Sequence, residues 1–177
     1  MQVIRPTVAA LTVSAALVIA IPTGAVAAAQ APATVTTTAT TAAPGTFGPY
    51  GYGGVRLGMT ARQAKATGKI VLKEPGHCAH WTYKAHRGTR DTGGVYISRK
   101  RGVAVIFATA GMRTPRGIGI GSTLRQIKKA YPNAKGKLNG YYATVPGNPK
   151  AYYYFGVDGR DRLQEFGLGL KTQDCVS

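Results

Sequence analysis

The sequence predicts an α+β fold: a tandem repeat of a short helix followed by an antiparallel sheet, the two sheets together forming a concave surface. The main observation is an internal repeat. Residues 54–68, GVRLGMTARQAKATG, match residues 117–131, GIGIGSTLRQIKKAY, at six of fifteen positions. Each copy leads into segments rich in β-branched and aromatic residues, which favour strands. Each copy is therefore predicted to start one helix-plus-sheet unit.

Both copies contain a Thr-x-x-Gln sequence, at Thr60 to Gln63 and at Thr123 to Gln126. This spacing is typical of a capping box, in which the threonine hydroxyl accepts from the amide three residues later and the glutamine side chain accepts from the threonine amide. Each helix would have about eight residues, which is too short to be stable alone in water, so each must pack on a sheet. The packing residues would be Met59, Ala61 and Ala64 in the first copy and Leu124, Ile127 and Ala130 in the second.

Apolar segments bounded by turn residues predict the strands. In the first unit, residues 47–112, the expected strands are 70–72, 78–83, 94–98 and 103–108. In the second unit, residues 113–177, they are 141–145, 151–157 and 163–170. The third and fourth strands of the first unit would form a hairpin with the basic tip Arg99-Lys100-Arg101-Gly102.

The N-terminal segment differs in composition from both units. Arg5 precedes an apolar run from Val8 to Ile21, and small residues follow, which is the layout of a secretory signal peptide over residues 1–29. An uncleaved membrane anchor is the alternative. Residues 30–46, rich in Ala, Thr and Pro, are expected to form a flexible linker. The protein is therefore predicted to be secreted, with association with the cell wall as a second option. No stable membrane insertion is expected after processing.

The chain has two cysteines, Cys78 and Cys175. In an oxidising compartment a lone pair is most simply one disulfide bond. The bond would close a loop of 97 residues, which stabilises a protein by about 4–5 kcal/mol in the chain-entropy model.

The mature chain would be strongly basic. Without Arg5, 22 of the 23 Lys and Arg residues remain against six Asp and Glu, a net charge of +16. Such a charge favours acidic partners, either an extracellular protein or an anionic polymer of the cell envelope, and it also serves solubility.

The sequence offers little for catalysis, so we expect no enzyme, no catalytic residue and no cofactor. The three serines after residue 46 lie in no nucleophile motif, and the six acidic residues are scattered. Imidazole and thiolate groups suit zinc, and His77, Cys78, His80 and His86 lie close together in sequence. Because Cys78 is expected to pair with Cys175, and a disulfide sulfur is no ligand, we predict no metal site.

Aromatic residues indicate a binding surface. Side chains alternate along a strand, so Tyr153 and Phe155 packed under a helix would place Tyr152 and Tyr154 on the other face. Tyrosine and arginine are enriched at protein interfaces, although tyrosines can also simply cover a thin sheet, and a basic turn is often just solvated. The predicted binding residues are Trp81, Tyr83, Tyr96, Arg99, Lys100, Arg101, Tyr142, Tyr152 and Tyr154.

The two copies GVRLGMTARQAKATG and GIGIGSTLRQIKKAY, each followed by strands, resemble the repeats of β-lactamase inhibitory proteins and, more distantly, small lipoproteins of outer-membrane β-barrel assembly. The resemblance covers most of residues 48–176. It implies non-catalytic binding of a target by the sheet surface. The predicted function is a secreted binding protein that recognises a protein partner, with inhibition of an extracellular enzyme as one form of this function. The alternative is an envelope module that binds anionic polymers or glycans.

Overall fold

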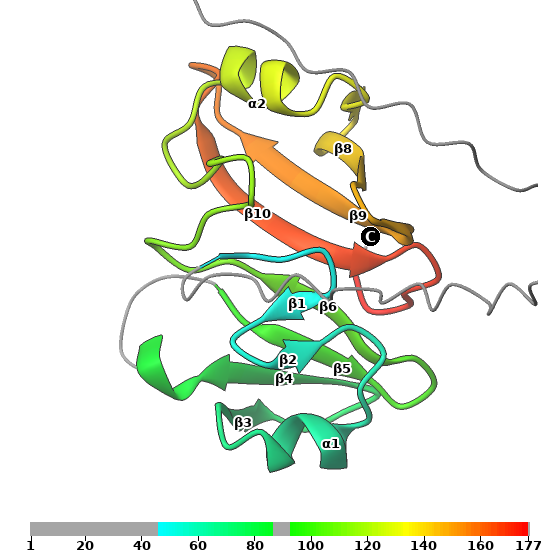
Figure 1. Cartoon of the computed structure of the whole chain (residues 1–177). Helices are drawn as coiled ribbons and strands as arrows, with labels where there is room; N and C mark the ends of the chain where they lie inside the picture. Colours follow the sequence, from blue (N-terminus) through cyan, green and yellow to red (C-terminus); the bar gives the residue numbers. More distant parts are fainter. Residues whose placement is uncertain (1–45, 87–92, 177) are drawn as a thin grey trace, which may run out of the picture. The chain divides into compact units, whose positions relative to one another are not determined.

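The central element is one antiparallel sheet of eight strands in the order β3-β4-β5-β6-β10-β9-β8-β7 (Figure 1). The computed structural model describes residues 46–86 and 93–176, so the expected signal peptide and residues 30–45 of the linker lie outside the described residues. The strands are β3 (Ile70–Glu74), β4 (Cys78–Tyr83), β5 (Val95–Ser98), β6 (Gly102–Phe107), β7 (Lys135–Lys137), β8 (Gly140–Val145), β9 (Asn148–Val157) and β10 (Leu163–Leu170).

The other elements are short. Strands β1 (Gly51–Tyr52) and β2 (Val55–Arg56) form a separate two-stranded sheet. The helices are α1 (Ala61–Ala66) and α2 (Leu124–Ala130), and one 3₁₀ turn, Lys84–His86, follows β4. No helix in the described ranges is long and apolar enough to cross a membrane.

The expected tandem of two helix-plus-sheet units with a concave pair of sheets is wrong. The protein is mostly β, and its long strands form a single continuous sheet. The reason is the pairing of β10 with β6, in which Gly167 pairs with Phe107 and Gly169 with Val105. Backbone hydrogen bonds across this pair leave no boundary between two sheets, because an unpaired strand edge there would leave its amides and carbonyls without partners.

Both helix starts are as predicted. The Thr60 hydroxyl accepts from the Gln63 amide at 3.2 Å, and the Thr60 amide donates to the Gln63 carboxamide at 2.9 Å. Thr123 and Gln126 make the same two bonds at 3.2 and 2.7 Å. Two of the four free amides at each helix start thus gain partners.

Removing either cap should lower stability. We expect Thr60→Ala and Thr123→Ala each to reduce the free energy of unfolding by about 0.5–2 kcal/mol, because each change leaves a helix amide without its acceptor. Urea denaturation measures the effect. Thr172→Ala, at an exposed threonine outside the helices and strands, is the control and should change stability by less than about 0.5 kcal/mol. Equal midpoints for all variants would contradict the assignment of the caps.

One face of the sheet forms the hydrophobic core, and strand β9 shows why. Tyr153 and Phe155 are 1 % and 0 % exposed, while the alternating residues Tyr152 and Tyr154 are half-buried on the opposite face, as the alternation predicted. The ring of Tyr131, at the end of α2, lies 5.3 Å from Tyr153 and 5.4 Å from Phe155. Helix α2 therefore packs on the core face of the sheet.

The segment before α1 also covers the core, which the sequence did not predict. The ring of Phe47 packs edge-on against Phe166 of β10 at 5.3 Å, and its carbonyl accepts from the Tyr153 hydroxyl at 3.1 Å. The ring of Tyr52 packs against Tyr83 of β4 at 5.2 Å. Figure 1 shows β1 and β2 in front of the large sheet, and these contacts place them on its core face.

Candidate binding face

The face of the large sheet opposite the core, here called the open face, carries a row of aromatic side chains from β4 to β8. Ala64 of α1 and Ile127 of α2 belong to the core, so both helices lie on the other side. Each member of this aromatic row is half-buried. In spatial order the row consists of His80, Tyr96, Phe107, Tyr154, Tyr142 and Tyr152.

Each ring of the aromatic row contacts the next. The centroid separations from His80 onwards are 4.9, 5.8, 6.3, 5.3 and 5.5 Å. The His80 and Tyr96 rings stack, whereas Phe107 meets both of its neighbours edge-on. Separations of about 4.5–7 Å with such angles are favourable for aromatic pairs. The row is therefore a connected surface and not a set of isolated rings.

Glycines provide the space in which the row lies. A Cβ atom on Gly169 of β10 would be 2.5 Å from Cζ of Tyr152, and one on Gly167 would be 3.1 Å from Cδ1 of Phe107. On the other side of the sheet centre, a Cβ atom on Gly94 would be 2.4 Å from Nε2 of His80. Side chains at these positions would push the rings away from the sheet. Sequence reasoning overlooked these glycines, although alternate glycines in β10 were a usable signal.

The turn between β7 and β8 is attached to the row. The Tyr142 hydroxyl donates to the Asn139 side-chain oxygen and the Tyr154 hydroxyl donates to the Asn139 carbonyl, both at 2.9 Å. The Lys137 ammonium lies 4.9 Å from the Tyr142 ring centroid, a cation–π distance. Between these residues, Leu138 is fully exposed, at 108 %. Leu138 could not be predicted as part of this surface from the sequence, because a lone leucine in a turn has no distinguishing pattern.

One carboxylate, Glu165, lies on the open face of β10. Partial burial raises the pKa of Glu165 above its usual value. Burial, followed by the charge of Glu165, raises the pKa of the neighbouring Tyr154. Burial, with a further contribution from Tyr142, raises the pKa of Tyr152 to about 12. Tyr152 and Tyr154 are therefore neutral at physiological pH, and their hydroxyls remain donors.

Glu165 should make stability depend on pH. Because its pKa is higher in the folded protein than in the unfolded chain, folding is favoured below the unfolded pKa and loses this contribution as pH rises through the folded pKa. We expect Glu165→Gln to raise the melting temperature at pH 7, with the gain shrinking to nothing on acidification below the usual glutamate range. Glu74→Gln, at an exposed position of β3, is the control. A gain that is independent of pH would contradict the desolvation explanation.

Two predicted binding residues are not on this face. Trp81 and Tyr83 of β4 are 8 % and 3 % exposed and belong to the core. The Tyr83 hydroxyl donates to the Tyr52 carbonyl at 3.2 Å, and burial raises its pKa. His80, the residue before Trp81, points to the opposite face of β4 and takes their expected place on the open face. Of the nine predicted binding residues, the structure brings Tyr96, Tyr142, Tyr152 and Tyr154 together in one row.

The basic tip, Arg99, Lys100 and Arg101, is the exposed turn between β5 and β6, as predicted. The Ser98 hydroxyl accepts from the Lys100 amide at 3.0 Å and from the Arg101 amide at 3.1 Å. These bonds order the backbone of the turn, while the three cationic side chains stay in solvent.

The predicted disulfide is present. Cys78 at the start of β4 is bonded to Cys175 near the C-terminus, with 97 residues between them in sequence. Next to it, Nε2 of His77 lies 3.2 Å from a carboxylate oxygen of Asp174. A hydrogen bond from the Ser98 hydroxyl, together with His77, holds the pKa of Asp174 below its usual value. His80 is stacked in the aromatic row, so the four residues considered for zinc do not converge on one point.

Comparison with protein-family models, with characterised proteins and with solved structures finds no match to this chain.

Proposed function

We propose that this protein is a secreted, non-enzymatic binding protein whose open face binds the acidic surface of a protein partner outside the cell. The observation that carries the proposal is the aromatic row, a connected and half-exposed set of rings that no described helix covers. Tyrosine supplies much of the binding energy at the centres of protein interfaces. The disulfide supports an oxidising location.

The rings are held in place before binding. Glycine backbones lie beneath the rings of Tyr152 and Phe107, and Asn139 accepts from the hydroxyls of Tyr142 and Tyr154. Ordering a free side chain at an interface costs about 0.5–1.5 kcal/mol. Because these side chains are already ordered, most of that cost is avoided, and Leu138 on the attached turn adds an exposed apolar group.

Charge favours an acidic partner. The whole chain has a net charge of +17. The basic tip follows β5, the strand that carries Tyr96 of the aromatic row, and Lys137 at the β7 edge of the sheet lies over the ring of Tyr142. Charges around an aromatic centre steer association and select partners of opposite charge. The resemblance of the sequence to inhibitory proteins makes an extracellular enzyme the first partner to test, with loss of its activity as the readout.

The row should dominate affinity. Once a partner has been isolated from secreted proteins on the immobilised protein, we expect Tyr152→Ala and Tyr154→Ala each to weaken binding by more than about 1 kcal/mol, as central aromatic anchors do. Calorimetry measures the affinities. Tyr50→Ala is the matched control, because Tyr50 is 56 % exposed and lies outside the row. Equal losses at Tyr50 and Tyr154 would contradict a binding role for this face.

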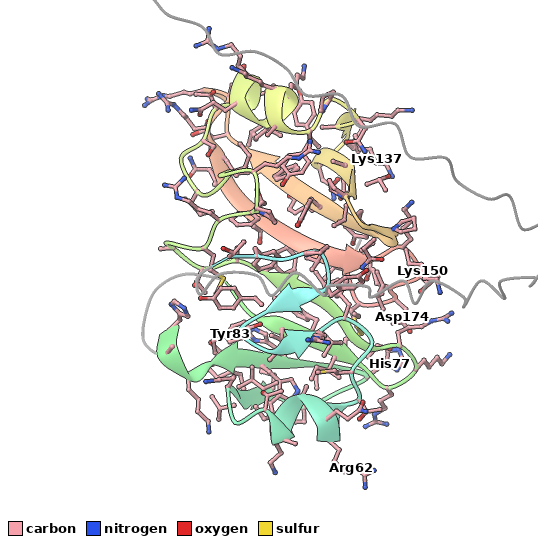
Figure 2. The ribbon with its side chains drawn as sticks, viewed as in Figure 1. Arg62, His77, Tyr83, Lys137, Lys150 and Asp174 are labelled. Atoms are coloured by element: carbon pink, nitrogen blue, oxygen red, sulfur yellow. A yellow bond between two sulfur atoms is a disulfide. The ribbon has the colours of Figure 1, made fainter. Side chains whose placement is uncertain are left out.

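The basic tip should act mainly on the association rate. Arg99→Glu and Lys100→Glu are expected to slow association while leaving the dissociation rate almost unchanged, since rim charges act through steering. Arg62→Glu on α1 is the control with the same change in net charge (Figure 2). A similar slowing in the Arg62 variant would show that net charge alone sets the rate.

The abundance of exposed cations favours one alternative, an envelope module that binds anionic polymers. Salt distinguishes the two functions. For polyanion binding, the logarithm of the binding constant falls steeply and linearly with the logarithm of the salt concentration. An interface centred on aromatic rings should persist in high salt. The polymer function would replace our proposal if the complex is lost in high salt, the tyrosine variants bind as the wild type does, and the basic-tip variants do not bind.

A further inference from the structure

The disulfide has two further metal-binding groups beside it. Nε2 of His77 lies 3.2 Å from Oδ2 of Asp174, and Sγ of Cys175 lies 3.9 Å from Oδ1 of the same carboxylate. The ligand atoms of His77, Cys78 and Asp174 all lie within 4.8 Å of one another. Figure 2 shows His77 and Asp174 next to each other, although they are 97 residues apart in sequence.

We infer that these four residues, His77, Cys78, Asp174 and Cys175, form a Zn²⁺ site when the disulfide is reduced. Two thiolates, one imidazole and one carboxylate are a four-ligand set of the kinds that zinc prefers. The inference is independent of the proposed binding function, and the oxidised protein in the structure does not have this site, because disulfide sulfurs are poor ligands.

The distances fit a tetrahedral ion. Zinc–ligand bonds of 2.0–2.3 Å place neighbouring ligand atoms roughly 3.3–3.8 Å apart. The distances of 3.2 Å from Nε2 of His77 to Oδ2 of Asp174 and of 3.9 Å from Sγ of Cys175 to Oδ1 of Asp174 are already close to this range. Binding through one of the two oxygens also requires a rotation of the Asp174 carboxylate. The main change required is the separation of the two sulfur atoms after their bond is broken, which rotation about the two cysteine side chains can provide.

The chemical step is a two-electron reduction followed by metal binding. A dithiol reductant gives two electrons and two protons to the disulfide, which yields two cysteine thiols, and the dithiol itself becomes a disulfide. Zn²⁺ then displaces the two thiol protons to solvent, and two zinc–sulfur bonds form. Electrons and protons balance without any further reactant.

Other contacts hold the two segments near each other after reduction. The carboxamide oxygen of Gln173 accepts from the Cys175 amide at 2.8 Å and from the Val176 amide at 2.9 Å. The Lys171 amide donates to the Lys150 carbonyl at 2.9 Å, which fixes the start of the C-terminal segment to β9. The Arg99 amide donates to the His77 carbonyl at 3.0 Å. None of these bonds involves a sulfur atom.

The charge of the chain is compatible with the site. Two thiolates and one carboxylate together exceed the double positive charge of zinc by one, so the occupied site is an anion. It would lie within a chain whose net charge is +17, and the basic tip begins at Arg99, which is hydrogen-bonded to His77. Because Zn²⁺ replaces two thiol protons, the site carries one negative charge both before and after binding, so the basic surroundings do not oppose its occupation.

Zinc affinity of the full protein, prepared without a histidine tag, tests the inference. The protein is reduced with a phosphine, and Zn²⁺ binding is measured by competition with a chromophoric chelator. We expect the reduced protein to bind one Zn²⁺ at least a hundredfold more tightly than the oxidised protein. His77→Gln and Asp174→Asn should each weaken binding by tenfold or more, and Cys78→Ser/Cys175→Ser should abolish it. His86→Gln, at the other end of β4, is the control and should bind as the wild type does.

Equal zinc affinity in the oxidised and reduced proteins would overturn the inference, as would full affinity in the His77→Gln/Asp174→Asn double variant. Reduction without zinc could unfold the chain, and circular dichroism monitors this. In that case one equivalent of Zn²⁺ should restore the folded spectrum of the wild type and fail to restore that of Cys78→Ser/Cys175→Ser. A reduced wild-type chain that stays unfolded with zinc also overturns the inference.

Discussion

Replacing Phe155 with alanine is expected to lower the free energy of unfolding by about 3–5 kcal/mol, the cost of removing a large side chain from a packed core. Phe155 is 0 % exposed, and its ring contacts those of Tyr131 and Tyr153 at 5.4 and 6.0 Å. The truncation leaves a cavity between β9 and α2. Urea denaturation at neutral pH measures the loss.

Two variants give this experiment its controls. Phe155→Leu keeps much of the apolar volume and should cost clearly less than Phe155→Ala. Tyr154→Ala, one residue earlier, removes a half-buried ring from the open face and should leave the fold nearly intact. If Tyr154→Ala unfolds the protein and Phe155→Ala does not, the facing of β9 is the reverse of that described, and the aromatic row cannot be the binding surface.

The double change Cys78→Ser/Cys175→Ser should destabilise the protein by about 2–5 kcal/mol, the usual cost of losing a native disulfide. The bond closes a 97-residue loop, and the unfolded chain gains the conformational freedom that this loop removes. The melting temperature and the urea midpoint should both fall. Chemically reduced wild-type protein, assayed without metal, is the matched control and should lose a similar amount. A double variant as stable as the oxidised wild type would contradict a structural role for the bond.

Local features of the structure could be predicted from the sequence because neighbouring residues determine them. A capping box needs only a threonine and a glutamine three residues apart, so Thr60 and Thr123 mark both helix starts correctly. Alternation along β9 depends only on strand geometry, and it places Tyr153 and Phe155 in the core. The disulfide followed from counting, since two cysteines allow a single intramolecular pair.

Features that depend on distant segments were predicted wrongly or not at all. The repeated sequence indicated two units, but pairing of β6 with β10 joins the strands into one sheet. For β4, alternation alone allowed either facing, and register with its neighbours placed Trp81 in the core and His80 on the open face. The segment from Phe47 to Tyr52 gave no sequence signal for its place on the core.

The sequence by itself thus determined where the helices start, which cysteines pair, which residues of β9 are buried and how strongly the chain is charged. The helix starts and the facing of β9 depend on spacing within a short stretch, whereas the disulfide and the net charge follow from counts over the whole chain. Only the tertiary structure decided that Tyr96, Phe107 and Tyr154 form one row, because their contacts require specific register across β5, β6, β10 and β9. The physical reason is that the glycines of β10 leave space for rings that belong to the neighbouring strands. Which strands become neighbours cannot be read from their positions in the sequence.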